Sequence, residues 1–252
     1  MSLAILFGVF ALGLIIGAPV AVTLGLASMT YLWFKGMPQK MFAGIDVFVL
    51  LCIPGFILAG NLMNRGGITG RIVRFANALV GWMRGGLGQA NVAGSMLFGG
   101  ISGTAVADAA SIGGMMIPGM KKAGYPADFS AAITAASSTV GPIIPPSVPM
   151  IIVGALSGIS VGKMFMAGAV PGIMMGLAMM VTTYIIAVRR GFPRQPWQGV
   201  RELCLAFLGA FWALAMTGLI VGGLLTGLAT PTETAVVASI YAFVVGACFY
   251  RE

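Results

Sequence analysis

Three long apolar runs constrain what this chain can fold into more than any other feature of its sequence. Residues 3–34, 164–188 and 203–232 contain no charged side chain. A helix needs about 20 consecutive apolar residues to cross the hydrocarbon core of a bilayer, and each run is at least that long. Only 8% of the residues are charged, against roughly 25% in a soluble domain. Because the runs do not alternate as the strands of a membrane β-barrel do, the sequence predicts an all-α polytopic membrane protein.

The formal net charge of +8 comes from basic residues in the linkers between the apolar runs. This placement follows the positive-inside rule and does not indicate a nucleic-acid partner. The number of crossings made by residues 3–34 is left open. If they cross once, the segment 89–120 re-enters and the N-terminus is inside, Lys35, Lys40 and Lys163 are expected outside, and the other eleven of the 14 basic residues face the cytoplasm. Those eleven are Arg65, Arg71, Arg74, Arg84, Lys121, Lys122, Arg189, Arg190, Arg194, Arg201 and Arg251.

Two segments contain interruptions that a simple membrane-spanning helix does not need. Residues 89–120 are rich in Gly and Ala and are divided near Ser-Gly-Thr at 102–104. Each half has about 15 residues, or roughly 22 Å of helix, less than the ~30 Å hydrocarbon core. We therefore predict a re-entrant helical hairpin.

Residues 127–160 are interrupted by four prolines within 142–149. Because these prolines cannot all lie inside a helix, we predict two half-helices joined by an unwound linker.

Further patterns concern the membrane surface and the helix ends. Residues 68–84 place arginines on one stripe and apolar side chains on the rest, which predicts an amphipathic helix in the interface plane. Asp46 is expected to cap the helix that follows it. Thr230 and Glu233 have the spacing of a capping box at the start of the last helix. The alternative for Glu233 is that it faces a polar pathway.

The hairpin break and the proline break offer complementary chemistry. Half-helix N-termini present N–H groups to an anion, and unwound carbonyls present oxygens to a hard cation such as Na⁺. Ser102 and Thr104 add hydroxyls at the hairpin break, and Asp108 adds a negative charge one turn later. The proline-broken segment adds further oxygens, from Ser137, Ser138, Thr139 and the carbonyls of 141–146. The residues therefore predict a cation site with a substrate beside it.

Plainer interpretations of these residues remain open at this point. Small residues in membrane helices mostly serve close helix packing, and Asp108 can simply pair with an arginine. An intramembrane carboxylate is nevertheless a functional-site hypothesis by default, and the presence of two breaks favours a transport site.

An enzyme is not indicated by the sequence. Gly-Ile-Ser-Gly at 100–103 matches the surroundings of the serine in rhomboid-type intramembrane proteases, but the chain contains no histidine to act as its base. An aspartyl intramembrane protease needs a second membrane carboxylate, and only Asp46 is available for that role. The three cysteines lie in apolar segments without disulfide or metal-binding spacing. No resident cofactor is therefore predicted.

Long motifs in the chain resemble a known family. "LFGGISGTAVADAASIG" at 97–113 and "AAITAASSTVGPIIPPSVPMIIVG" at 131–154 closely resemble the large membrane subunit of tripartite ATP-independent periplasmic (TRAP) transporters, of the DctM/SiaM type. "GLATPTETAVVASIYAFVVG" at 227–246 is similar to the G-L-x-T-P-T-E-A-A signature of that family. The resemblance covers essentially the whole chain.

The resemblance implies a secondary transporter of the bacterial inner membrane that imports organic acids, such as C4-dicarboxylates or sialic acid. It implies Na⁺ as the coupling ion and an elevator motion that carries the hairpin and the broken helix. It also implies two protein partners, a small four-helix membrane subunit of the DctQ/SiaQ type and a periplasmic substrate-binding protein of the DctP/SiaP type.

By the family pattern, one Na⁺ site joins the hairpin tip to the unwound linker. Its residues in this sequence are Ser102, Thr104, Asp108, Gly141, Ile144 and Pro146. We expect the substrate to lie beside this ion, against Gly103, Thr139 and Ser147. Thr104 stands where serine is common in the family, a change that keeps the hydroxyl.

The chain departs from the family in length, because large subunits of this kind continue through a second inverted half with another hairpin. The expected organisation is a first inverted-repeat half and the start of the second, as a fragment or a split subunit. Its parts are scaffold helices with the amphipathic arm (1–88, arm 68–84), the re-entrant hairpin (89–120), the discontinuous helix (127–160), a helix with a basic cytoplasmic linker (161–202) and two truncated second-half helices (203–252).

Two other functions are compatible with a membrane protein of this kind. Divalent-anion/Na⁺ symporters have a similar architecture, but their tips are of the Ser-Asn-Thr type, whereas this tip is Ser-Gly-Thr. A membrane scaffold without transport activity would not need the four prolines within 142–149.

Overall fold

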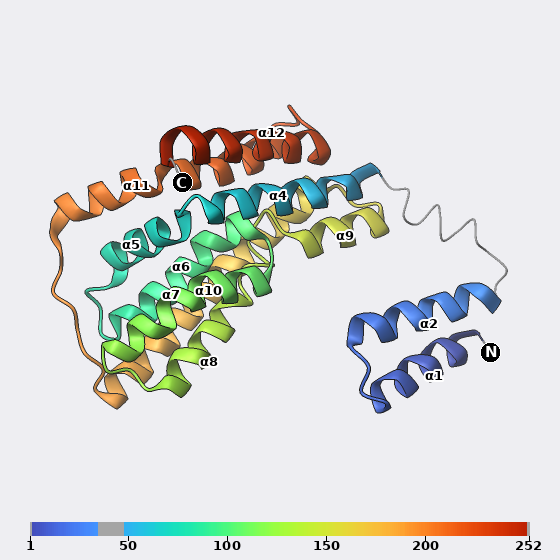
Figure 1. The fold of residues 1–252 in the computed structure, drawn as a ribbon, viewed down its shortest axis with the longest axis horizontal. Coiled ribbons are helices and arrows are strands. Elements are labelled where there is room, and N and C mark those ends of the chain that lie inside the picture. Colours follow the sequence, from blue (N-terminus) through green and yellow to red (C-terminus); the bar gives the residue numbers. More distant parts are fainter. Residues whose placement is uncertain (1, 35–47, 251–252) are drawn as a thin grey trace. The chain divides into compact units, whose positions relative to one another are not determined.

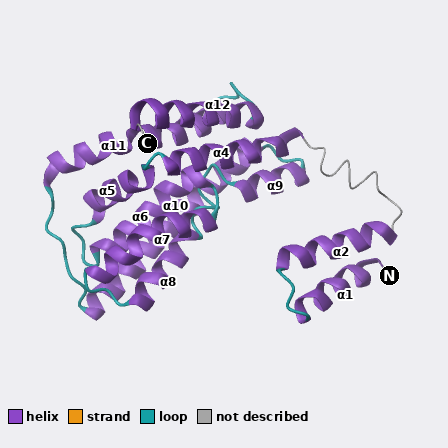
Figure 2. Cartoon of the chain, in the orientation of Figure 1, coloured by secondary structure: helices purple, strands orange, loops and turns teal. Residues whose placement is uncertain are grey.

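The computed structural model describes residues 2–34 and 48–250, and every regular element within these ranges is a helix (Figure 2). The chain divides into two compact units, residues 1–47 and 48–252. Among the described residues, four helical segments are long and apolar enough to cross a membrane, namely Phe48–Arg65, Val161–Arg190, Gly199–Leu225 and Pro231–Cys248. The predicted all-α polytopic membrane protein is confirmed. The cap predicted at Asp46 lies outside the described residues.

The described part of the first unit contains two helices, α1 (Ser2–Ile15) and α2 (Val20–Phe34) (Figure 1). The chain breaks between them at Gly17, which has a φ of +80°, and Pro19 follows at the start of the next helix. The Thr23 hydroxyl donates to the Pro19 carbonyl at 3.0 Å and tightens this turn. The first apolar run therefore forms two short helices, each below the length of about 20 residues that a straight crossing needs.

In the second unit, α4 (Cys52–Arg65) packs along α12 (Pro231–Val244). A Cβ atom added at Gly55 would lie only 2.9 Å from that of Ala235, so the two backbones approach closely. The Ser239 hydroxyl donates to the Gly55 carbonyl at 2.8 Å across the same contact. Small residues and hydroxyl hydrogen bonds are how membrane helices associate without a hydrophobic driving force. A 3₁₀ turn, η1 (Phe48–Leu51), precedes α4, and a π-helical turn, η2 (Val245–Tyr250), follows α12.

The amphipathic helix α5 (Ile68–Val80) packs against α11 (Gly199–Leu225) and buries one apolar face. Ile72 and Ala76 are fully buried, while the Arg74 side chain is 57% exposed. The helix ends four residues before the predicted position, because residues 81–85 form a turn.

The predicted hairpin is formed by α6 (Gly86–Ser102) and α7 (Ala105–Lys122). The two helices have 17 and 18 residues, so each is roughly 26 Å long. They are longer than the predicted halves but still shorter than the ~30 Å hydrocarbon core. Leu87 at the start of α6 packs on the cluster that contains Tyr125 beyond the end of α7. Both legs therefore return to the same end of the unit, and their re-entry into a bilayer stays a prediction.

The proline-rich segment separates α8 (Ala127–Ser138) from α9 (Val148–Ser157), and α10 (Val161–Arg190) follows. Pro149 lies in the first turn of α9, where a proline costs no intrahelical hydrogen bond. The other three prolines lie in the unwound linker. Helix α6 contacts α5, α7, α8 and α10, and Figure 1 shows it in the interior of this helical group.

The predicted capping box at the start of α12 is confirmed. The Glu233 amide donates to the Thr230 hydroxyl oxygen at 3.3 Å. In return the Thr230 amide donates to the Glu233 carboxylate at 2.7 Å. Glu233 therefore stabilises a helix end.

Candidate functional site

The break between α6 and α7 is closed by Ser102, Gly103 and Thr104. Ser102 ends α6, and Gly103 adopts a φ of +61°, a conformation that glycine accepts without strain. Thr104 caps α7, where its hydroxyl oxygen accepts a hydrogen bond from the Ala107 amide at 3.4 Å. The first amides of α7 have no intrahelical partner, so the positive end of that helix lies at this tip.

Ser147 organises the break between α8 and α9. Its hydroxyl oxygen accepts from the Met150 amide at 3.2 Å, and its hydroxyl donates to the carbonyl of Pro142. At the other end of the linker, the Ile144 amide donates to the Val140 carbonyl at 3.0 Å. The linker is thus a defined turn that ends at the N-terminus of α9.

The structure brings the hairpin tip and the proline linker together. The Val148 amide donates to the Gly103 carbonyl at 3.4 Å. A Cβ atom added at Gly99 would lie 2.6 Å from the Cα atom of Gly141, and one added at Gly103 would lie 2.7 Å from the Pro146 carbonyl oxygen. The carboxyl ends of α6 and α8 therefore meet the amino ends of α7 and α9. The carbonyls at the carboxyl ends of α6 and α8 suit a cation, and the amides at the amino ends of α7 and α9 suit an anion.

Asp108 lies in the first turn of α7 and is fully buried. Within the described part of the chain, neither oxygen of its carboxylate accepts a hydrogen bond. Hydroxyls of Ser95 on α6 and Ser138 on α8 face it, but the Ser138 hydroxyl donates to the Thr134 carbonyl at 2.8 Å. The alternative pairing of Asp108 with an arginine is not found among the described residues. Hydroxyls do not neutralise a buried carboxylate, which is costly without a counter-charge, and a bound cation would supply that charge.

A buried polar cluster beside Asp108 joins α6 to α8. The Asn91 amide nitrogen donates to the Thr134 hydroxyl oxygen at 2.7 Å, and the Ser95 and Ser137 hydroxyls share a hydrogen bond of 3.0 Å. The sequence prediction included Ser137 but omitted Asn91, Ser95 and Thr134. Asn91 and Ser95 are four residues apart and so lie on one helix face, but single small polar residues are common in membrane helices, so this spacing is a weak signal.

The remaining predicted residues occupy different surroundings. Thr139 follows α8, is exposed, and donates its hydroxyl to the Ala136 carbonyl at 2.7 Å. The Ile144 side chain packs against Gly172 of α10. Ser102, Gly103, Pro146 and Ser147 line one narrow void at the junction, together with Phe56, Ile101, Val148 and Ile151. The structure thus gathers tip and linker residues, while their binding roles stay predictions.

One ion pair links α5 to the start of α11. The Nε atom of Arg74 donates to the Glu202 carboxylate at 2.6 Å. This hydrogen bond, together with the attraction between the charges, raises the pKa of the Arg74 guanidinium. Exposed pairs of this kind contribute little to stability, so its main consequence is to neutralise Glu202.

Apolar helices of membrane-spanning length accompany two interrupted helix pairs whose broken ends meet, and the first turn of α7, next to this junction, carries a buried carboxylate. This combination defines a multi-pass membrane protein of the transporter class, in which broken helices supply ion and substrate sites. The chain belongs to the family described as "Tripartite ATP-independent periplasmic transporter, DctM component", whose model matches residues 7–252. That family consists of transporter permeases, which are not enzymes.

Relatives with assigned names support this membership. The sialic acid TRAP transporter permease protein SiaT of Haemophilus influenzae (strain 86-028NP) is 43% identical over 94% of this chain and 39% of its own length. The C4-dicarboxylate TRAP transporter large permease protein DctM of Vibrio cholerae is 40% identical over 100% of this chain and 57% of its own length. The sialic acid large permease protein SiaM of Vibrio cholerae is 45% identical over 84% of the chain and 50% of its own length. The chain spans about half the length of the curated relatives it matches.

Proposed function

We propose that this chain forms part of a permease of the bacterial inner membrane that imports organic acids with Na⁺ as the coupling ion. The observation that carries the proposal is the buried carboxylate of Asp108, which has no hydrogen-bond partner among the described residues. Hydroxyl and carbonyl oxygens at the tip and the linker are the hard ligands that an alkali cation prefers. Thr104, Gly141, Ile144 and Pro146 would supply these oxygens together with Ser102.

The organic-acid substrate class is supported by the relatives and by helix electrostatics. The relatives' printed names specify sialic acid, C4-dicarboxylate and 2,3-diketo-L-gulonate. The amino ends of α7 and α9, which meet at the junction, suit a carboxylate. Gly103 and Ser147 line this junction, and we propose that they contact the substrate with Thr139.

Transport by this permease is proposed to need a small membrane subunit of the DctQ/SiaQ type and a periplasmic binding protein of the DctP/SiaP type. Hydrogen bonds between Asn91 and Thr134 and between Ser95 and Ser137 tie α6 of the hairpin to α8 of the broken helix. A group held together in this way can move as one body, which is what an elevator motion requires. Family membership and these contacts support the proposal.

The test is substrate uptake by the complete transporter, reconstituted in proteoliposomes with its membrane partner and binding protein. Asp108→Asn keeps the shape of the side chain and removes its charge. We expect it to abolish uptake driven by an inward Na⁺ gradient while the protein still inserts into the membrane. The matched control is Asp128→Asn, at the exposed start of α8, which should transport normally. Uptake by Asp108→Asn at the control rate would contradict the assignment.

A further inference from the structure

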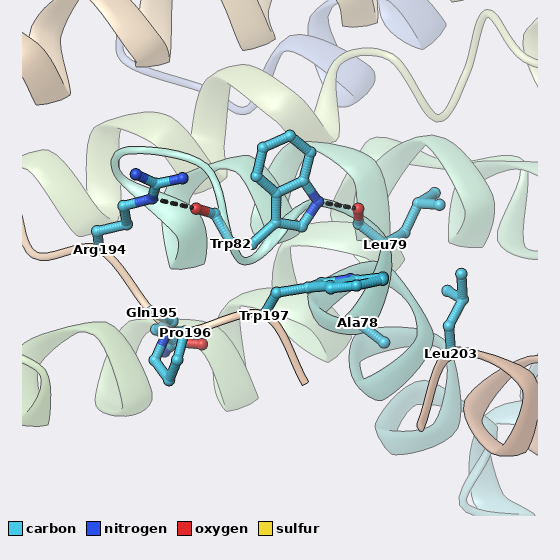
Figure 3. Close-up of a pocket in the computed structure, with 8 residues that line it drawn as sticks. All are labelled: Ala78, Leu79, Trp82, Arg194, Gln195, Pro196, Trp197 and Leu203. Carbon is cyan, nitrogen blue, oxygen red and sulfur yellow. Dashed lines mark hydrogen bonds between the residues drawn. The ribbon is translucent and has the colours of Figure 1, made fainter. Parts of the chain in front are cut away.

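A groove outside the tip and linker lies where α5 meets the linker between α10 and α11. It has a volume of about 800 Å³ and is lined by Leu79 and Trp82 on one side and by Arg194, Pro196 and Trp197 on the other. Figure 3 shows the two indole rings beside the opening, with Arg194 at the edge of the Trp82 turn. The Trp82 and Trp197 residues are 42% and 59% exposed. Tryptophan is enriched at the level of lipid headgroups, where one end of its ring is apolar and the other is wet.

The contacts around the groove give it a fixed shape. The Trp82 indole nitrogen donates to the Leu79 carbonyl at 2.9 Å, and the Arg194 Nε atom donates to the Trp82 carbonyl at 3.0 Å (Figure 3). An isolated antiparallel bridge also pairs Arg84 with Arg194. Within the described residues, the terminal nitrogens of Arg194 make no hydrogen bond. They remain available to a ligand at the mouth of the groove.

The linker that contributes Arg194 to this mouth is positively charged. The segment 189–201 carries four arginines and no carboxylate. The nearest acidic residue in the sequence, Glu202, is paired with Arg74 at 2.6 Å. A planar guanidinium with free terminal nitrogens matches the oxygens of a phosphate. The mouth therefore complements an anionic headgroup.

The groove continues as a second, apolar groove between α5 and α11. This second groove has a volume of about 480 Å³, shares Leu79 and Leu203 with the first, and is otherwise lined by Phe75, Cys204, Phe207 and Leu208. A free phosphate or nucleotide would leave this apolar track empty. A partner helix would fill the track but would not need the arginine and the two tryptophans at its mouth.

We propose that the two grooves together bind one phospholipid with an anionic headgroup, such as phosphatidylglycerol. The headgroup phosphate lies against Arg194 between Trp82 and Trp197, and an acyl chain follows the track along Phe75 and Phe207. The bound lipid lies in the groove along the contact between the amphipathic helix α5 and the spanning helix α11.

Native mass spectrometry of the detergent-extracted protein tests this proposal. The protein is titrated with phosphatidylglycerol or with phosphatidylcholine of the same acyl chains. We expect the protein to retain at least fivefold more phosphatidylglycerol than phosphatidylcholine. Arg194→Gln should bring the ratio of the two retained lipids near one. Arg194→Lys, which keeps the charge, should restore most of the preference, and Arg65→Gln on α4 should leave it unchanged. Equal retention of both lipids, or a preference that survives Arg194→Gln, would overturn the proposal.

Native cysteines provide a second readout on the same samples. Cys204 lines the apolar track, whereas Cys248 is exposed elsewhere. Phosphatidylglycerol should slow maleimide labelling of Cys204 severalfold and leave Cys248 unaffected, and Arg194→Gln should lose this protection. Protection of Cys204 that requires another polypeptide, and not the lipid, would assign the groove to a protein partner and contradict the proposal.

Discussion

Gly103 holds the hairpin tip in a conformation that other residues adopt only with strain. Its φ is +61°, and a Cβ atom there would also lie 2.7 Å from the Pro146 carbonyl oxygen. Gly158 has a similar φ of +67° but nothing within 4 Å of an added Cβ. Comparing the same substitution at the two glycines therefore separates the cost of backbone strain from the cost of steric contact.

Gly158→Ala should lower the free energy of unfolding by about 1 kcal/mol, the order of the left-handed penalty. Gly103→Ala should cost clearly more, because the linker must also move away. Thermal unfolding of both variants in the same detergent measures the difference. Equal losses would mean that the tip does not pack against the linker as described.

At the level of single residues, only part of the candidate site could be predicted from the sequence. Asp108 is conspicuous because a carboxylate inside an apolar hairpin has few structural explanations. Asn91, Ser95 and Thr134 are not conspicuous in the sequence, because single small polar residues are common in membrane helices. Their importance arises only when α6 and α8 pack together, and pairing of two helices cannot be read from either helix alone.

Among the elements, the start of α12 shows a local rule that holds without tertiary information. Thr230 and Glu233 form the capping box that their spacing predicts, because all its partners lie within four residues. Thr230→Ala removes one amide acceptor and should lower the free energy of unfolding by about 1 kcal/mol. The control is Thr182→Ala on α10, whose hydroxyl only donates to the Ala178 carbonyl of its own helix. A thermal unfolding scan in which both variants behave alike would argue against the cap.

The breaks between helices were predicted more accurately than the lengths of the helices. Three prolines lie in the linker as expected, since proline excludes a continuous helix. The hairpin helices are longer than predicted, and α5 is shorter. Helix ends depend on caps and neighbouring contacts, such as the left-handed Gly85 that begins α6, and composition does not reveal these.

Within the second unit as a whole, basic linkers lie at the same end. Tyr125 and Phe129, around the start of α8, lie against Phe192 beyond the end of α10, each with ring centroids 4.8 Å away. Lys121 and Arg190 are therefore at the same end of the unit, as the positive-inside rule expects of residues on one side of a membrane.

Cysteine labelling in cells tests this orientation. Single cysteines replace Lys121 or Arg190 in a background without Cys52, Cys204 and Cys248. Both should resist a membrane-impermeant maleimide added from outside and react after the membrane is permeabilised. Lys163→Cys, at the start of α10, should react from outside. Labelling of Lys121→Cys or Arg190→Cys in intact cells would reverse the topology.

The central proposal is that Asp108 belongs to a Na⁺ site, and Na⁺-dependent thermal stabilisation measures this most directly. A ligand at ten times its Kd stabilises the native state by about 1.4 kcal/mol. The protein and Asp128→Asn should therefore unfold at a higher temperature in NaCl than in KCl of equal concentration. Asp108→Asn should show no such difference, and in KCl it should be no less stable than the unaltered protein, because it buries no uncompensated charge. An Asp108→Asn variant that Na⁺ still stabilises as strongly as the unaltered protein would contradict the proposal.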